Sequence, residues 1–204
     1  MTADKPVDAG SETTGCDPDR AWVEAAAAGD QQAYGELVHR YEGRIFNLVR
    51  ASIGRDPDAE DTAQEIFVRA FRGLGRFRQD STFKTWLYAI AANVIRTHLR
   101  RRARWPLAPR GRPDAEREES MARDLEPESG DESAEAVLVR RDAIDRALAT
   151  LTPDLRLVVT LRDVDGLDYR QIAAALGVPI GTVESRLFRA RQRLRPLLGP
   201  LLGK

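Results

Sequence analysis

A tight turn near the C-terminus precedes five arginines: Arg186, Arg189, Arg191, Arg193 and Arg195. Short predicted helices flank that turn, at residues 177–179, where Gly177 permits a left-handed conformation. Small Ala173 and apolar Val183 stand where two such helices pack closely. The pattern is typical of a helix-turn-helix, whose second helix enters the DNA major groove. Because arginine binds phosphates and guanine edges, residues 168–195 predict a DNA-reading surface. The alternative is a helical hairpin with a solvated basic face.

A second predicted helix carries four acids: Asp58, Glu60, Asp61 and Glu65. Gln64 and Glu65 follow Asp61 by three and four residues, so these three side chains share one helix face. Three interpretations fit acids in this pattern. They bind a metal, they form a solvated face that stabilises the helix N-terminus, or they dock on a basic partner. Charge alone leaves the last two interpretations open and gives the metal site least support.

Aromatic and basic side chains alternate in a third segment: Arg72, Arg76, Phe77, Arg78, Phe83, Lys84, Trp86, Tyr88 and Arg96. Exposed aromatic rings beside arginines stack unpaired bases, at ~1–3 kcal/mol per base. Phe83 and Trp86 also fit core positions at helical spacing, which is the interpretation we favour for these two. The polar loop 77–80 lies between two helices, and we interpret it as a site that holds a flipped base.

Helix signals place these residues on a first helical block, residues 20–104. Asp19 and Asp30 predict the N-caps of its first two helices, and Asp56-Pro57 predicts the start of the third. Ser81 predicts the cap of a fourth helix, which runs into basic residues 100–104. The apolar face predicted for the third helix contains Ala59, Ala63, Ile66, Phe67, Ala70, Phe71 and Leu74.

Prolines and glycines interrupt the helical pattern over residues 105–135, whose second half is acidic. A second block then begins, in which Thr152-Pro153, Pro179 and the Asp168–Gln171 spacing predict helix starts. No segment alternates as a strand does. The sequence therefore predicts an all-α fold with a disordered acidic tail (1–19), an N-terminal helical bundle (20–104), a flexible linker (105–135) and a C-terminal four-helix domain with a helix-turn-helix (136–204).

Composition excludes several classes of protein. The 204 residues balance 32 basic against 32 acidic side chains. No apolar run approaches the ~20 residues of a spanning helix, and no signal pattern opens the chain, so we expect a cytoplasmic protein without membrane insertion. The single cysteine, Cys16, allows no intrachain disulfide, and His39 and His98 are distant in sequence. We expect no metal, no cofactor and no enzymatic activity.

Three segments together resemble bacterial sigma factors, in the order that this family has. Residues 58–71 (DAEDTAQEIFVRAF) resemble its polymerase-binding segment, residues 82–93 (TFKTWLYAIAAN) its promoter-element helix, and residues 181–191 (GTVESRLFRAR) its last recognition helix. The chain is similar to the extracytoplasmic-function (ECF) group, which keeps only sigma domains two and four. The resemblance covers about residues 20–104 and 136–198.

The resemblance implies a role for each segment. Four residues are implied to dock on the clamp helices of the largest subunit of core RNA polymerase: Asp58, Asp61, Gln64 and Glu65. Capture and melting of the −10 element fall to Phe77, Arg78, Gln79, Asp80, Ser81, Lys84, Trp86 and Asn93. Duplex binding at the −35 element falls to Thr182, Glu184, Ser185, Arg186, Phe188, Arg189 and Arg191. Glu184 departs from relatives that carry a basic residue there, which leaves the −35 sequence open.

The resemblance also implies partners. They are core polymerase, including the flap of its second-largest subunit, promoter DNA, and an anti-sigma factor; in holoenzyme the protein is expected on the nucleoid. A free-standing helix-turn-helix regulator is the alternative. It explains residues 168–195 but leaves the first helical block without a role.

Overall fold

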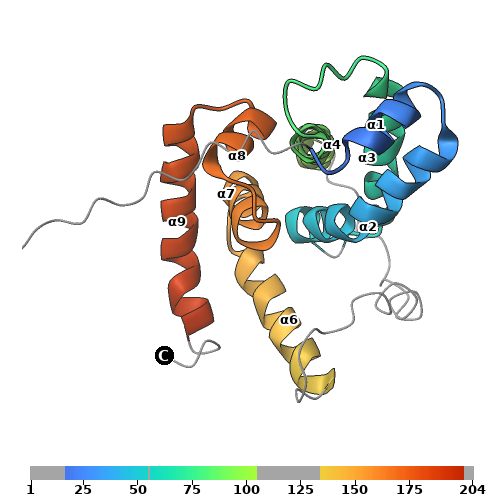
Figure 1. The fold of residues 1–204 in the computed structure, drawn as a ribbon. Helices are drawn as coiled ribbons and strands as arrows, with labels where there is room; N and C mark the ends of the chain where they lie inside the picture. The colour runs from blue at the N-terminus through green and yellow to red at the C-terminus, as the bar shows by residue number, and fades with distance from the viewer. Residues whose placement is uncertain (1–16, 55, 105–133, 200–204) are drawn as a thin grey trace, which may run out of the picture.

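The structure is a computed structural model that describes residues 17–54, 56–104 and 134–199. Within these ranges the chain forms helices and turns and no strand, which confirms the all-α prediction (Figure 1). The helices are α1 (Arg20–Ala27), α2 (Gln31–Ile53), α3 (Ala59–Leu74), α4 (Phe83–Arg104), α6 (Ala134–Ala149), α7 (Pro153–Val159), the π-helical turn η2 (Thr160–Val164), α8 (Tyr169–Leu176) and α9 (Ile180–Leu198). Most of the predicted tail, and the predicted linker up to residue 133, lie outside the described residues.

Local sequence signals set several helix ends as predicted. The Asp30 carboxylate accepts hydrogen bonds from the N–H groups of Gln32 and Ala33 at the start of α2. Asp168 and Gln171 form a complete capping box at the start of α8. Gly177 ends α8 in the left-handed conformation, with φ of 63°, which a residue with a side chain adopts at a cost.

Four predicted helix starts differ from the structure. Asp56-Pro57 was predicted to open the third helix, but α3 begins at Ala59 with Asp58 as its N-cap, and the Asp56 carboxylate accepts the Asp58 N–H instead. Asp19 precedes α1, but its side chain makes no cap bond: it is buried, accepts a hydrogen bond from the Tyr41 hydroxyl and pairs with Arg40. Thr82, not Ser81, caps α4, because its hydroxyl accepts the Thr85 N–H at 3.2 Å. Pro179 occupies the N-cap of α9 rather than its first helical position.

The N-terminal half, residues 17–104, packs α1 to α4 around buried aliphatic and aromatic side chains. Ile45, Leu48, Ile66 and Leu87 are fully buried at its centre. The predicted face of α3 is buried except at Phe67, which is half-buried, and at Phe71. Phe71 is 49% exposed and meets Tyr34 edge-on, while Ala70 beside it is fully buried. The burial of a side chain at the border of a helix face depends on where the neighbouring helix ends. Helical spacing in the sequence does not reveal that position.

The C-terminal half, residues 134–199, packs α7 and α8 against α9. Val183, Leu187 and Ala190 of α9 are buried, as are Val158 and Leu161 on the segment from α7 to η2. The Leu167 N–H donates to the Leu161 carbonyl and so closes the turn that leads into α8. These contacts hold α8 and α9 in a fixed relation across the Gly177 turn.

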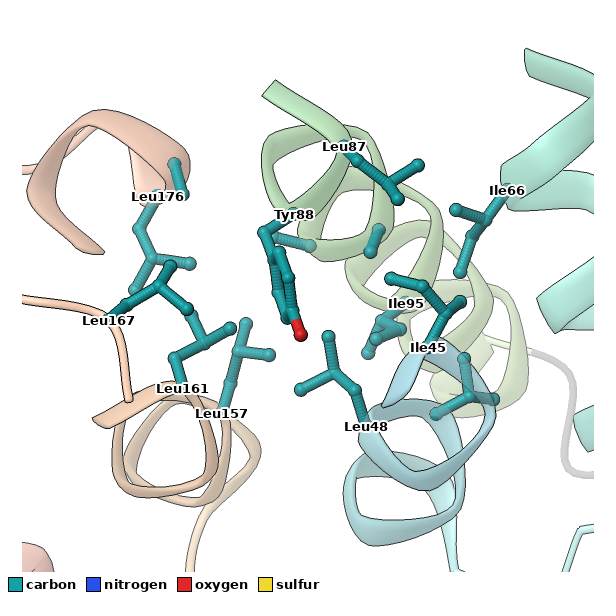
Figure 2. Packing of buried hydrophobic residues seen from close by; sticks show 14 of the residues in the cluster. Ile45, Leu48, Ile66, Leu87, Tyr88, Ile95, Leu157, Leu161, Leu167 and Leu176 are labelled. Carbon is teal, nitrogen blue, oxygen red and sulfur yellow. The ribbon is translucent and has the colours of Figure 1, made fainter. Parts of the chain in front are cut away.

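The two halves share one continuous apolar core. Tyr88 of α4 lies between the N-terminal half and Leu157, Leu161 and Leu167 of the C-terminal half (Figure 2). Arg156 donates hydrogen bonds to the Ser52 carbonyl in the other half and to the Ala149 and Leu151 carbonyls in its own. The sequence predicted two domains on a tether and gave no sign that they touch.

The capping box supports a first testable prediction. Replacing Asp168 with alanine removes the side-chain acceptor for the Gln171 N–H and should cost about 1 kcal/mol of stability. Thr152 is the matched control because it is the N-cap of α7 and makes no side-chain cap bond. We expect the midpoint temperature of thermal unfolding to fall for Asp168→Ala and to stay unchanged for Thr152→Ala. If the unfolding temperature fell equally in both variants, the Asp168 side chain would not stabilise the protein through its cap hydrogen bond.

Candidate functional site

Helix α9 presents a polar face opposite its buried one. Val183, Leu187, Ala190 and Leu194 point into the core. Four predicted DNA-binding residues on the other side are exposed: Glu184, Ser185, Phe188 and Arg189. The ring of Phe188 is 65% exposed. With the Gly177 turn and α8 behind it, this is the geometry of a helix-turn-helix.

Two of the arginines predicted for the same surface are paired with acids of their own half. Arg186 donates to Asp154 at 3.1 Å and its side chain is 22% exposed. Arg191 donates to Asp163 at 2.6 Å, and that hydrogen bond raises the pKa of Arg191. Thr182 is half-buried. The predicted DNA-binding arginines therefore differ in the structure: Arg186 and Arg191 form ion pairs with acids of their own half, whereas Arg189 is exposed.

The acids of α3 line its outer face. Asp61, Gln64 and Glu65 are exposed, and Glu65 pairs with Arg69 at 2.6 Å. Asp58 is the N-cap of the helix and is half-buried, so it belongs to the end of this face. The face continues into two exposed apolar side chains, Val68 and Phe71. Their spacing of three and six residues from Glu65 is visible in the sequence, but the same helical spacing also predicts Phe71 on the apolar face of the helix.

The loop between α3 and α4 is held by an aromatic cluster. Phe77 stacks on Trp86 with ring centroids 4.8 Å apart, and both rings meet Phe83. Phe83 is buried and Trp86 half-buried, as the core interpretation of these two residues required. Phe77 is also half-buried, because its ring packs in this cluster. Exposed polar residues follow it: Arg78, Gln79, Asp80 and Ser81.

The remaining predicted residues of α4 lie on opposite sides of the helix. Asn93 is exposed. Lys84 points at the C-terminal half and donates to the Asp165 carbonyl at 2.7 Å. Arg96, which the sequence places in a segment of aromatic and basic residues, donates to the Leu176 carbonyl at 3.1 Å. Tyr88 and Asp165 form a buried pair that sequence reasoning missed, because they are 77 residues apart.

A second polar cluster joins the start of α3 to the end of α4. The ligand atoms of Asp56, Asp58 and His98 lie within 4.8 Å of one another, although sequence distance had separated His98 from these acids. Arg102 also donates to Asp56. Burial alone would raise the pKa of Asp56, but the Asp58 N–H, His98 and the Arg102 charge outweigh it and hold that pKa below its usual range. A cation of the protein thus already neutralises Asp56.

Two family models match the chain, one to each half. The model described as Sigma-70 region 2 matches residues 37–104, and the model described as Sigma-70, region 4 matches residues 141–194. The first match contains the acidic face of α3 and the aromatic cluster, and the second contains the helix-turn-helix. The order of the two regions agrees with the order of the segments in the sequence.

Curated relatives match along nearly the whole chain. The RNA polymerase sigma-H factor of Pseudomonas aeruginosa is 39% identical over 193 residues, which cover 90% of this chain and 95% of that protein. The ECF RNA polymerase sigma-E factor of Escherichia coli K12 is 38% identical, with 91% of this chain and 97% of that protein covered. The chain therefore belongs to the ECF sigma factors, the DNA-binding and polymerase-binding subunits of transcription initiation.

Solved structures agree with this assignment. CnrH in complex with the cytosolic domain of CnrY has a TM-score of 0.65 at 27% identity and covers 89% of this chain and 97% of that one. The sigma factor RpoE in complex with the anti-sigma factor NepR from Bartonella quintana has a TM-score of 0.62 at 26% identity, with 81% and 96% covered. In the described part of this chain, no helix combines the length and apolar character needed to span a bilayer.

Proposed function

We propose that this chain directs core RNA polymerase to promoters with separate −35 and −10 elements and helps to melt the −10 region. The observation that carries the proposal is the exposed polar face of α9, opposite a fully buried face in a helix-turn-helix. Membership of the sigma family indicates which reaction is involved. The reaction is RNA synthesis by the core polymerase, and the sigma factor selects the site at which it starts. No catalytic residue of this chain is part of the proposal.

The outer face of α3 is the proposed polymerase contact. Asp61, Gln64 and Glu65 offer carboxylate and amide groups to basic clamp helices of the largest subunit, and Asp58 extends this surface at the helix start. Exposed Val68 and Phe71 add apolar area beside the charges. This combination of apolar centre and polar surround is common in protein interfaces. The C-terminal half is proposed to contact the flap of the second-largest subunit.

The loop after α3 and one side of α4 are the proposed −10 site. Exposed Arg78, Gln79, Asp80 and Ser81 would bind a base extruded from the non-template strand, with exposed Asn93 further along α4. The stacked Phe77–Trp86 pair supports this loop from below rather than stacking on the base itself. Lys84 completes the proposed set once it is released from Asp165.

The exposed face of α9 is the proposed −35 site. Arg189 and Ser185 are placed for base edges, Phe188 for a thymine methyl group, and Glu184 for a cytosine amino group. Arg186 and Arg191 lie nearer the supporting helices and are proposed phosphate contacts after exchange of their acidic partners. An anti-sigma factor is a further proposed partner, supported by the structural neighbour RpoE, which was solved in complex with the anti-sigma factor NepR.

Co-elution of the full chain with core polymerase free of other sigma factors tests the proposal. We expect a stoichiometric complex, followed by run-off transcripts from genomic fragments that contain its promoters. A folded chain that binds no polymerase, but binds a duplex site alone at ~10⁻⁸ M or better, would instead identify a free-standing regulator.

The −35 proposal gives a prediction for one base. Arg189→Ala should lower the affinity for the −35 duplex by ~1–3 kcal/mol and relax discrimination at a single position. The measurement is holoenzyme binding to a library of −35 variants. Arg193, exposed one turn further along, is the matched control and should change affinity equally for all sequences. An equal loss across the library for Arg189→Ala would make Arg189 a phosphate contact.

A further inference from the structure

The loop that joins α3 to α4 is fixed at both of its ends. After α3, two backbone hydrogen bonds of 3.0 Å close a turn that ends at Phe77. Before α4, the Phe83 N–H donates to Asp17 Oδ2 at 2.6 Å, although these two residues are 66 positions apart in the chain. The exposed residues 78–81 therefore span the distance between two anchored points.

Gln79, in the middle of this loop, has a left-handed backbone. Its φ is 58°, and among the residues that the structure describes it alone combines a side chain with a positive φ. A side chain makes this conformation costly, so the conformation persists where the surrounding structure imposes it. Because Gln79 is exposed, the restraint comes from the two ends of the loop and not from packing of its own side chain. The loop therefore has a defined shape that its own sequence does not favour.

Gly73 lets the ring of Trp86 lie directly against α3. A Cβ atom on Gly73 would be 3.2 Å from Trp86 Cζ2 and 3.5 Å from Trp86 Cη2. Gly43 of α2 differs, because an added Cβ there has free space and meets no neighbouring segment within 4 Å. In its position against α3, Trp86 stacks on Phe77 at the start of the loop. A side chain at position 73 would push Trp86 away from the ring that anchors the loop.

We propose that Gly73 and Asp17 are positioning residues for the −10 strand, and that they hold loop 78–81 in the shape that receives an extruded base. Gly73 acts through the stack of Trp86 on Phe77 at one end of the loop, and Asp17 acts through the start of α4 at the other. Neither residue touches DNA in this proposal. The role in DNA binding rests on the proposed −10 function, whereas the restraint on the loop does not.

The expected size follows from the entropy of ordering the loop. A loop that is ordered before DNA arrives does not lose this entropy on binding, so the restraint raises the affinity. Fixing the backbone of one residue corresponds to about a five- to thirtyfold change in an equilibrium constant. Loss of either anchor should therefore weaken strand binding about tenfold, and should expose the loop to proteolysis by a similar factor.

Two variants remove the anchors, and each has a matched control. Gly73→Leu forces the tryptophan ring from α3, and Gly43→Leu makes the same change where space is open. Asp17→Ala removes an acceptor at the start of α4, and Asp30→Ala removes an acceptor of the same kind at the start of α2. Asp17→Asn keeps an acceptor oxygen and is the conservative variant. Thermal unfolding establishes that each chain is folded in the assays, and Gly73→Ala takes the place of Gly73→Leu if leucine prevents folding.

One measurement uses no DNA and the other uses a single strand. Limited digestion of the full chain with trypsin, followed by mass spectrometry of the peptide that ends at exposed Arg78, reports whether the loop is held. Fluorescence anisotropy reports the −10 site. Its probe is a labelled single strand selected from a random pool by holoenzyme with the parent chain, and binding by core polymerase alone is subtracted.

The two anchor variants should behave alike. We expect cleavage after Arg78 to become about tenfold faster, and strand affinity to fall about tenfold, in Gly73→Leu and Asp17→Ala. Gly43→Leu should match the parent in both measurements, and Asp17→Asn should restore most of the parent behaviour. Asp30→Ala should also match the parent in both, although its unfolding temperature falls.

Each outcome decides one point. Rapid cleavage after Arg78 in the parent, or cleavage that neither anchor variant accelerates, would overturn the restraint, and so would an equal acceleration in Asp30→Ala. Faster cleavage with unchanged strand affinity would overturn the role in DNA binding and leave the restraint. Holoenzyme that binds no strand beyond core polymerase alone would remove the proposed −10 function and the DNA role of both anchors, while the cleavage rates would still decide the restraint.

Discussion

Replacing Asp61 with arginine is expected to weaken binding to core RNA polymerase by about thirtyfold or more. The side chain is exposed in the first turn of α3, on the face proposed to meet basic clamp helices. A like-charge contact in an interface costs several kcal/mol, and about 2 kcal/mol already gives this loss. The effect on the fold is small. An arginine in the first helical turn loses the favourable dipole interaction, which amounts to about 0.3–1 kcal/mol.

The control for this variant is the same charge reversal elsewhere. Glu36 is an exposed acid on α2, outside the proposed face of α3, and Glu36→Arg should bind core polymerase nearly as the parent does. Both affinities are measured by titration of labelled chain with core enzyme, with thermal unfolding recorded in parallel. Equal weakening in the two variants would mean that only net charge matters, and parent-like binding of Asp61→Arg would move the docking face away from α3.

What the sequence predicted well is local. The Asp30 cap, the Asp168–Gln171 capping box and the Gly177 turn depend on residues within four positions of one another, so the pattern alone decides them. The exposed faces of α3 and α9 follow from helical spacing in the same way. For this reason the candidate site was predicted best where it lies on one helix.

What the sequence did not predict depends on distant contacts. Asp19 was expected to cap α1, but Tyr41 and Arg40 of α2 take its carboxylate. Phe77 was predicted only as part of a loop that holds a flipped base, and the stacking of its ring on Trp86 was not predicted. The Tyr88–Asp165 pair joins two halves whose intervening sequence reads as a tether. Charge and periodicity carry no information about which of many acids and aromatics meet across such a separation.

The aromatic cluster beneath the α3–α4 loop gives the largest effect on stability. Replacing Phe83 with alanine should cost ~3–5 kcal/mol, because the ring is 1% exposed and the lost volume leaves a cavity. Its centroid lies 5.6 Å from that of Tyr41 of α2 and 5.8 Å from that of Trp86 of α4, so the substitution removes a contact between these two helices. Against a typical total of about 5–15 kcal/mol, this is a large fraction of the stability.

Phe188→Ala is the matched control, because it makes the same change at a ring that is 65% exposed. We expect its unfolding midpoint in urea to remain near that of the parent, while the midpoint of Phe83→Ala falls sharply and Phe83→Leu lies between them. The same packing carries the polar loop 78–81, so Phe83→Ala should also weaken binding of a single-stranded −10 oligonucleotide at temperatures where the chain is still folded. If Phe83→Ala lowered stability but left that binding intact, the loop would not depend on the cluster beneath it.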